Sequence, residues 1–180
     1  MGKDINVHIL KYNYETNLYE ELKIYRKRTP KDYEYEDSLD GIENNPYYLI
    51  RPYTARNQSL FNILLNKNDE NKITDDFPCI TPCFNSYSAE FNTFLQEKAK
   101  TGCYFDFYET TFADVSNYLE QNPTIIDSDI ELEDPTLTVV RENPVVEFYE
   151  SCCAYLTFAE YDSGSSLILS SYKIVYYFDV

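Results

Sequence analysis

The most informative pattern in this chain is SYKIVYYFDV, residues 171–180. Ile174 to Phe178 is an unbroken apolar and aromatic run in a chain whose formal net charge is -16. A strand with no polar face has neighbours that cover both of its sides, so it belongs in the middle of a sheet. We therefore expect a buried central strand here, with Asp179 at its polar end.

The opposite end of the chain carries a second strand pattern. From Asp4 to Lys11, apolar residues alternate with polar ones, a period of two that is typical of a strand with one buried face. Residues 18–27 alternate again, and the loop YNYETN between the two stretches favours a hairpin. The C-terminal strand satisfies its hydrogen bonds most simply beside the first strand, so we predict that the two ends of the chain pair.

Four segments between these ends predict helices, because their apolar residues recur at helical spacing and their ends carry capping residues. They are residues 54–66, a segment capped by Ser86 or Ser88 that runs to Lys100, a segment capped by Thr111 with Asp114 that ends near Pro123, and a segment opened by Asn143-Pro144 that runs to Ala159. Tyr104 to Tyr108 fits a short strand.

The sequence thus predicts a single α+β domain over residues 1–180. Its small central sheet is mostly antiparallel, is built from the N-terminal hairpin and the C-terminal strand, and is covered by about four helices. Two acidic stretches lack any period: we interpret residues 29–46 as a loop and residues 125–135 as a linker.

The charge of the chain is unevenly distributed. Residues 1–100 carry a net charge of -3, whereas residues 101–180, whose only basic residues are Arg141 and Lys173, carry -13. Such a field repels phosphate backbones, so we expect no direct binding to DNA or RNA. The acidity suits a basic partner protein, or it serves only to keep a tyrosine-rich chain in solution.

No stretch approaches the roughly 20 apolar residues of a membrane helix, and the first residues lack the basic and then apolar pattern of a signal peptide. We expect an intracellular protein without a membrane partner. The cysteines are odd in number, which argues against a disulfide framework, and their spacing with the single histidine does not suit zinc. They are Cys79, Cys83, Cys103, Cys152 and Cys153. We expect reduced thiols, no metal and no cofactor.

Three further stretches stand out: MGKDIN at 1–6, ARNQSLFNIL at 55–64 and YKIVYYFDV at 172–180. They are similar to three motifs, Met-Gly-Cys-Asp-Ile-His at the start, Gly-Arg-Asn-Tyr-x-Leu-Phe-x-x-Leu between, and Arg-x-Val-Phe-x-Phe-Asp-Asn at the end. In these three motifs the chain resembles a family of small phage and prophage proteins. Lys3, Asn6 and Lys173 stand where the family has cysteine, histidine and arginine.

The resemblance implies a shared fold and a phage setting, with the protein in the cytoplasm of an infected bacterium, and it implies no particular reaction. A catalytic or metal-binding role for the family's histidine would be lost in this chain, because Asn6 takes its place.

The polar residues of these stretches, with their neighbours, form the predicted ligand site, because the paired strand ends bring them together near the start of the first helix. They are Asp4, Asn6, His8, Arg56, Asn57, Lys173, Tyr177 and Asp179. Arginine forks suit phosphate, carboxylates accept from sugar hydroxyls or base amino groups, and Tyr12, Tyr53 or Tyr177 could stack on a base. The alternative is a structural network in which Arg56 ties the helix to the sheet.

The sequence contains no G-x-S-x-G, P-loop, H-E-x-x-H or C-x-x-C motif, which favours a binding protein over an enzyme. The leading hypothesis is a phage-encoded counter-defence protein that sequesters a small nucleotide-type immune signal. One alternative is an acidic inhibitor that mimics nucleic acid and binds a host defence protein. The other is a hydrolase of such a nucleotide. We also expect a homodimer, because a tyrosine-rich surface favours association.

Overall fold

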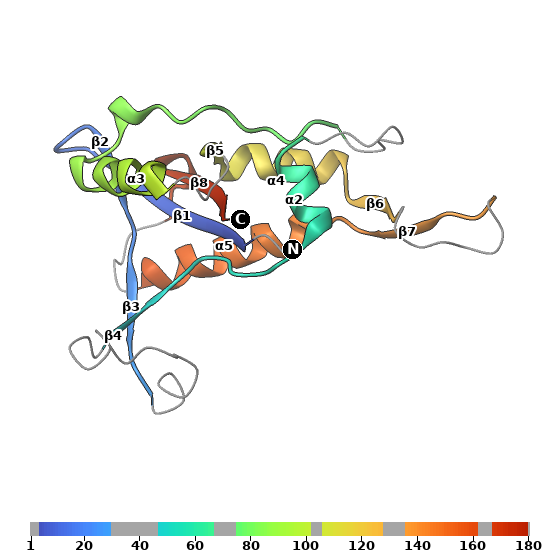
Figure 1. Ribbon diagram of the computed structural model, residues 1–180, viewed down its shortest axis with the longest axis horizontal. Coiled ribbons are helices and arrows are strands. Elements are labelled where there is room, and N and C mark those ends of the chain that lie inside the picture. Colours follow the sequence, from blue (N-terminus) through green and yellow to red (C-terminus); the bar gives the residue numbers. More distant parts are fainter. Residues whose placement is uncertain are drawn as a thin grey trace.

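The computed structural model describes residues 4–29, 47–66, 75–101, 106–127, 136–161 and 167–179. Its centre is an antiparallel sheet of four strands in the order β2-β1-β8-β5 (Figure 1). These strands are β1 (Asp4–Asn13), β2 (Leu18–Glu21), β5 (Tyr108–Thr111) and β8 (Tyr172–Asp179). The predicted α+β class, with about four helices over a sheet of the two chain ends, is confirmed.

The pairing of the two chain ends is also confirmed. β1 and β8 run antiparallel over eight residue pairs, from Asp4 opposite Asp179 to Lys11 opposite Tyr172. β8 lies between β1 and β5, and Ile174 to Phe178 are all buried. The apolar run therefore occupies the central position that its lack of a polar face predicts.

One face of this sheet carries the larger core. The helices α2 (Gln58–Leu64), α4 (Phe112–Gln121) and α5 (Val145–Ala159) bury apolar side chains against it. A ring contact joins Phe61 to Phe178 at 4.7 Å between centroids, and the Tyr176 hydroxyl donates to the Leu64 carbonyl at 3.0 Å. The sheet residues of this core alternate along both strands: Ile5, Val7, Ile9, Ile174, Tyr176 and Phe178.

The opposite face of the sheet is covered by α3 (Ala89–Thr101), which lies across β1 from α5 in Figure 1. Phe91 and Leu95 of α3 pack against Leu10 and Val175. Tyr87, next to the short 3-10 turn Phe84–Ser86, joins this smaller core. This face also holds polar side chains, and it is therefore the face on which a site can form.

Two short ribbons extend from the body (Figure 1). One pairs β3 (Ile24–Lys27) with β4 (Tyr47–Ile50), and the other pairs β6 (Thr124–Asp127) with β7 (Val139–Glu142). The linker expected at 125–135 is thus wrong for its first three residues, which belong to β6, and the remainder lies outside the described residues. Of the acidic loop expected at 29–46, only Thr29 is described.

The single strand expected at 18–27 is divided into β2 and β3. The chain bends at Leu22, where the Tyr155 hydroxyl of α5 donates to the Leu22 carbonyl at 3.0 Å and accepts from the Ile24 amide at 3.1 Å. These bonds replace the ladder bonds that a continuous strand would make. Alternation continues through the bend, so the pattern alone does not locate it.

The predicted helices are present with shifted ends. The first begins only at Gln58, because Asn57 is extended and its side chain accepts from the Leu60 amide as an N-cap. Ser88 accepts from the Phe91 amide and Thr111 from the Asp114 amide, as the sequence predicts. The strand expected at 104–108 begins at its last residue, Tyr108; residues 104 and 105 lie outside the described ranges.

No helix within the described ranges is long and apolar enough to cross a membrane. The described cysteines are free thiols: Cys79, Cys83, Cys152 and Cys153. Burial raises the pKa of Cys152, so this thiol stays protonated. Among the described residues, no three histidine, cysteine or acidic side chains are grouped to hold a metal ion.

Candidate functional site

The α3 face of the sheet brings together most of the predicted site residues. The β1–β8 register places Asn6 opposite Tyr177 and Asp4 opposite Asp179. Because opposite residues in an antiparallel pair share a face, as do residues two apart along a strand, His8 and Lys173 lie on it too. The strand geometry therefore collects these six side chains on one surface.

A chain of hydrogen bonds links three side chains at one end of this face. The Asn6 amide donates to a carboxylate oxygen of Asp179 at 2.8 Å. The Arg51 guanidinium donates to the Asn6 carbonyl oxygen, also at 2.8 Å. Asn6 is only 8% exposed, so both of its polar groups are satisfied within the protein. We call Asn6, Arg51 and Asp179 the amide cluster.

His8 lies next to the amide cluster on the same strand face. Its Nδ1 is 2.5 Å from a carboxylate oxygen of Glu21, and Lys23 lies 3.6 Å from the other oxygen. The imidazole packs between aromatic rings, with centroids 5.0 Å from Phe94 and 5.8 Å from Tyr177. Its Nε2 is buried and has no hydrogen-bond partner among the described residues.

The Tyr177 ring stacks against the imidazole of His8. Its side chain is fully buried, its ring is nearly parallel to the imidazole at 12°, and Lys98 of α3 lies 5.9 Å from its centroid. Burial raises the pKa of Tyr177 to about 12; the Asp179 carboxylate adds to the rise and the Arg51 guanidinium opposes it. The hydroxyl makes no hydrogen bond to any described group.

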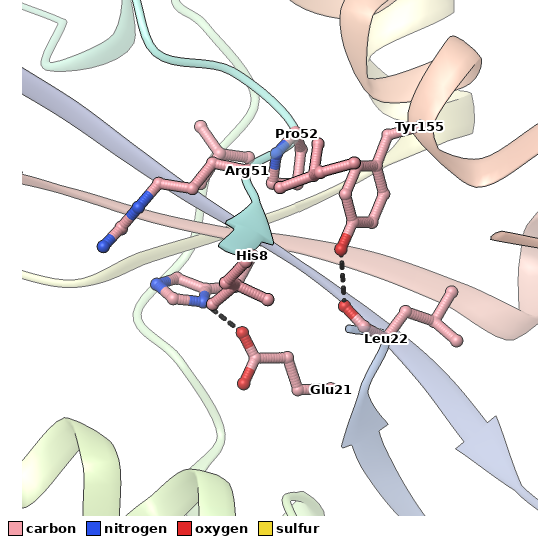
Figure 2. Close-up of a pocket in the computed structure, with 9 residues that line it drawn as sticks. His8, Glu21, Leu22, Arg51, Pro52 and Tyr155 are labelled. Atoms are coloured by element: carbon pink, nitrogen blue, oxygen red, sulfur yellow. Dashed lines mark hydrogen bonds and ion pairs between the residues drawn. The ribbon is translucent and has the colours of Figure 1, made fainter. Parts of the chain in front are cut away.

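A small pocket borders this region (Figure 2). One wall consists of His8, Glu21 and Leu22, and the other is the segment 49–52 at the end of β4. Its free space is about that of one water molecule. In Figure 2 the Nδ1 of His8 points to Glu21, and the second ring nitrogen lies on the other side of the ring. Segment 49–52 therefore lies across the pocket from His8.

Arg56 lies at the exposed end of the sheet rather than in the amide cluster. It forms an ion pair with Asp4, with one guanidinium nitrogen 3.2 Å from a carboxylate oxygen, and the side chains are 67% and 52% exposed. The hydrogen bond from Arg56 lowers the pKa of Asp4. Asn57 is occupied as the N-cap of α2. This pair therefore ties α2 to the start of β1, as the structural alternative expects.

Lys173 is held at the other end of the face. Its ammonium is 2.5 Å from Glu109 of β5 and 4.5 Å from the centroid of the Tyr19 ring. The Tyr87 hydroxyl donates to the second oxygen of Glu109, which is 2% exposed. Of the other tyrosines considered for stacking, Tyr53 is buried in the core of the opposite face, and Tyr12 packs near the hairpin turn.

Three residues of this surface are not predicted from the sequence. Arg51 carries no local signal, because it precedes Pro52 in an irregular segment. Glu109 belongs to β5 and lies just beyond the strand expected at 104–108. Glu21 could have been found, because its place opposite Leu10 follows from the hairpin register and puts it on the face of His8.

The chain was compared with protein-family models, with curated proteins and with solved structures, and nothing matches it in any of the three comparisons. The resemblance to the phage proteins stays a prediction.

Proposed function

We propose that this chain is a binding protein that sequesters a small nucleotide-type signalling molecule during phage infection. The observation that carries the proposal is the amide cluster, in which a guanidinium, an amide and a carboxylate are held together. Beside it are two buried polar atoms, His8 Nε2 and the Tyr177 hydroxyl, that have no hydrogen-bond partner among the described residues. Buried polar atoms in proteins nearly always have a partner, so such a pair favours a ligand contact.

Each group of the cluster suits one part of a nucleotide. A guanidinium has five N–H donors, and the bond to Asn6 uses one, so Arg51 can bind phosphate oxygens through others. Asp179 accepts from Asn6 through one oxygen, and its other oxygen can accept from a ribose hydroxyl. The rings of Phe94 and Tyr177 supply apolar surface next to these groups.

The pocket in its present shape holds about one water molecule, so the proposal requires segment 49–52 to move away from His8 when a nucleotide enters. Movement of this segment carries Arg51 with it and breaks the hydrogen bond from Arg51 to Asn6. Amide hydrogen exchange of residues 49–51 in the free protein checks this requirement, because a segment that opens readily exchanges faster than β1.

Calorimetric titration with adenosine and guanosine mono- and cyclic dinucleotides tests the function. Arg51→Ala should weaken binding at least about tenfold, the size expected for one charge-assisted hydrogen bond. The matched control is Arg141→Ala on the exposed strand β7, which should leave the affinity unchanged. Absence of binding to every nucleotide would remove the proposal, as would equal losses in the two variants.

Arg56→Ala separates the two arginines that lie near the sheet end. If the amide cluster alone holds the ligand, this variant binds as the parent protein does. If its loss equals that of Arg51→Ala, the site extends over Asp4 and Arg56, as the sequence hypothesis has it. Chromatography of the titration mixtures identifies any product, and turnover would favour the hydrolase alternative.

The acidic-inhibitor alternative is favoured by one further observation, the net charge of -13 on residues 101–180. It predicts a basic partner protein whose binding weakens with salt. Neutral substitutions in the acidic stretch 127–134 should abolish that interaction and leave nucleotide binding intact, whereas Arg51→Ala should do the reverse.

A further inference from the structure

His8 is the single histidine of the chain and is 6% exposed. Its Nδ1 lies 2.5 Å from Glu21. An ionised carboxylate only accepts hydrogen bonds, so the Nδ1 atom must carry a proton to make this contact. The geometry thus identifies Nδ1 as a hydrogen-bond donor. Whether the other ring nitrogen, Nε2, carries a proton depends on the groups around it.

The neighbourhood of His8 holds basic side chains and no described acceptor for Nε2. Lys23 lies 3.6 Å from Glu21 and already offsets part of its charge. Arg51 is bonded to Asn6, two residues before His8 on the same face, and Lys98 lies over the neighbouring Tyr177 ring. A proton on Nε2 would add a further positive charge, and it would be a buried donor with no described acceptor.

We propose that His8 Nε2 accepts a hydrogen bond from a neutral donor of the ligand, a nucleoside hydroxyl or an exocyclic amino group, and that Glu21 is a positioning residue that holds the required tautomer. This inference rests on the proposed nucleotide site and defines the orientation of the ligand in it. Phosphate oxygens are acceptors and cannot bond an unprotonated Nε2, so they lie toward Arg51. The sugar or base then lies toward His8.

The tautomer is tested first, without any ligand. Long-range proton–nitrogen NMR of the free protein resolves one imidazole, because the chain has one histidine. The expected spectrum has a protonated Nδ1 and an unprotonated Nε2. Glu21→Leu should shift the population toward the Nε2–H form while the protein stays folded, a spectroscopic change that loss of packing alone does not cause. A doubly protonated ring, or an unchanged tautomer in Glu21→Leu, overturns the inference.

The donor is tested with adenosine 5′-monophosphate, its 2′-deoxy and 3′-deoxy analogues, and inosine 5′-monophosphate. One analogue should bind about tenfold more weakly than adenosine 5′-monophosphate, because the donor that it lacks leaves Nε2 unpaired. The deoxy analogues identify a hydroxyl and the inosine nucleotide identifies the amino group. Binding of adenosine 5′-monophosphate should also shift the Nε2 resonance.

His8→Phe keeps an aromatic ring and removes the acceptor, so it should bind all four nucleotides with equal affinity. The analogue series on the parent protein gives the same information if this variant does not fold. Equal affinities in the parent protein, or an unmoved Nε2 resonance, overturn the inference and leave the proposed function standing. If none of these four nucleotides binds, and none of the mono- and cyclic dinucleotides used to test the function binds, the inference and the proposed function are both overturned.

Discussion

Lys173 shows how a residue can match a binding pattern and yet be engaged inside the protein. It was predicted as a ligand contact, and it lies on the right face of the sheet, but its ammonium is 2.5 Å from Glu109, whose side chain is 2% exposed. Glu109 also accepts from Tyr87, which ties the segment before α3 to the sheet. The buried carboxylate of Glu109 stabilises the fold only while both partners are present, because loss of either leaves it incompletely compensated.

Lys173→Met should lower the free energy of unfolding by about 3 kcal/mol, because it leaves a buried carboxylate without its cation. Adding Glu109→Gln should recover most of this loss, since glutamine still accepts from Tyr87 and carries no charge. Urea denaturation measures both variants, with the exposed Lys100→Met as a control expected to change stability by less than about 0.5 kcal/mol. A loss equal to that of the control would show that Glu109 does not need the ammonium.

At the scale of elements, the start of α4 is decided locally. Thr111 is extended and its hydroxyl accepts from the Asp114 amide at 3.1 Å, while it donates to the Asp114 carboxylate at 2.7 Å. The carboxylate also lies in the first turn, where the helix dipole favours negative charge. Both features are visible in four consecutive residues, and for that reason the sequence predicts this boundary correctly.

Thr111→Ala should destabilise the protein by about 1 kcal/mol through loss of the cap. Thr111→Ser should cost much less, because serine keeps the hydroxyl. Thermal or urea unfolding of the two variants gives the comparison. Equal losses would mean that the threonine methyl group, rather than the cap, supplies the stability at this position.

The division of residues 18–27 into β2 and β3 is also a feature of the elements, but its cause is a residue far away in the sequence. The Tyr155 hydroxyl that bonds to both sides of the bend comes from α5, more than 130 residues away. The alternation of residues 18–27 gives no indication of the contact with Tyr155. The sequence therefore predicts that a strand is present and does not predict where it ends.

Over the whole molecule, burial of tyrosines links stability to alkaline pH. Burial raises the pKa of Tyr53 and of Tyr177 to about 12, against about 10 in the unfolded chain. Between these values the unfolded state has released the proton and the folded state keeps it, so the free energy of unfolding falls as pH rises. The contribution is complete below about pH 10 and is lost toward pH 12.

The expected slope is about -1.4 kcal/mol per pH unit for each of the two tyrosines. In Tyr53→Phe the free energy of unfolding should fall less steeply between pH 10 and 11.5, by about 1.4 kcal/mol per pH unit. Urea unfolding at fixed ionic strength measures this slope. Tyr161→Phe is the matched control, because that side chain is 82% exposed, and it should leave the slope unchanged. A Tyr53 variant with the parent's slope would contradict the assignment.

Features that depend on neighbours along the chain can be predicted from the local sequence. The apolar run at Ile174 to Phe178 indicates a central strand, alternation from Asp4 indicates its partner, and the cap at Thr111 starts a helix. Pairing the two strand ends then places Asn6 near Asp179 without further information. These features follow from side-chain period and capping, which are local physical effects.

Which arginine joins Asn6 and Asp179 depends on long-range packing. Arg51 and Arg56 lie five residues apart, on either side of an irregular turn, and no local pattern distinguishes them. The Asn57 cap sets the start of α2 and leaves Arg56 at the exposed sheet end, while the β3–β4 ribbon carries Arg51 over Asn6. The physical reason is that burial and hydrogen-bond satisfaction of a long polar side chain depend on the packing of distant segments.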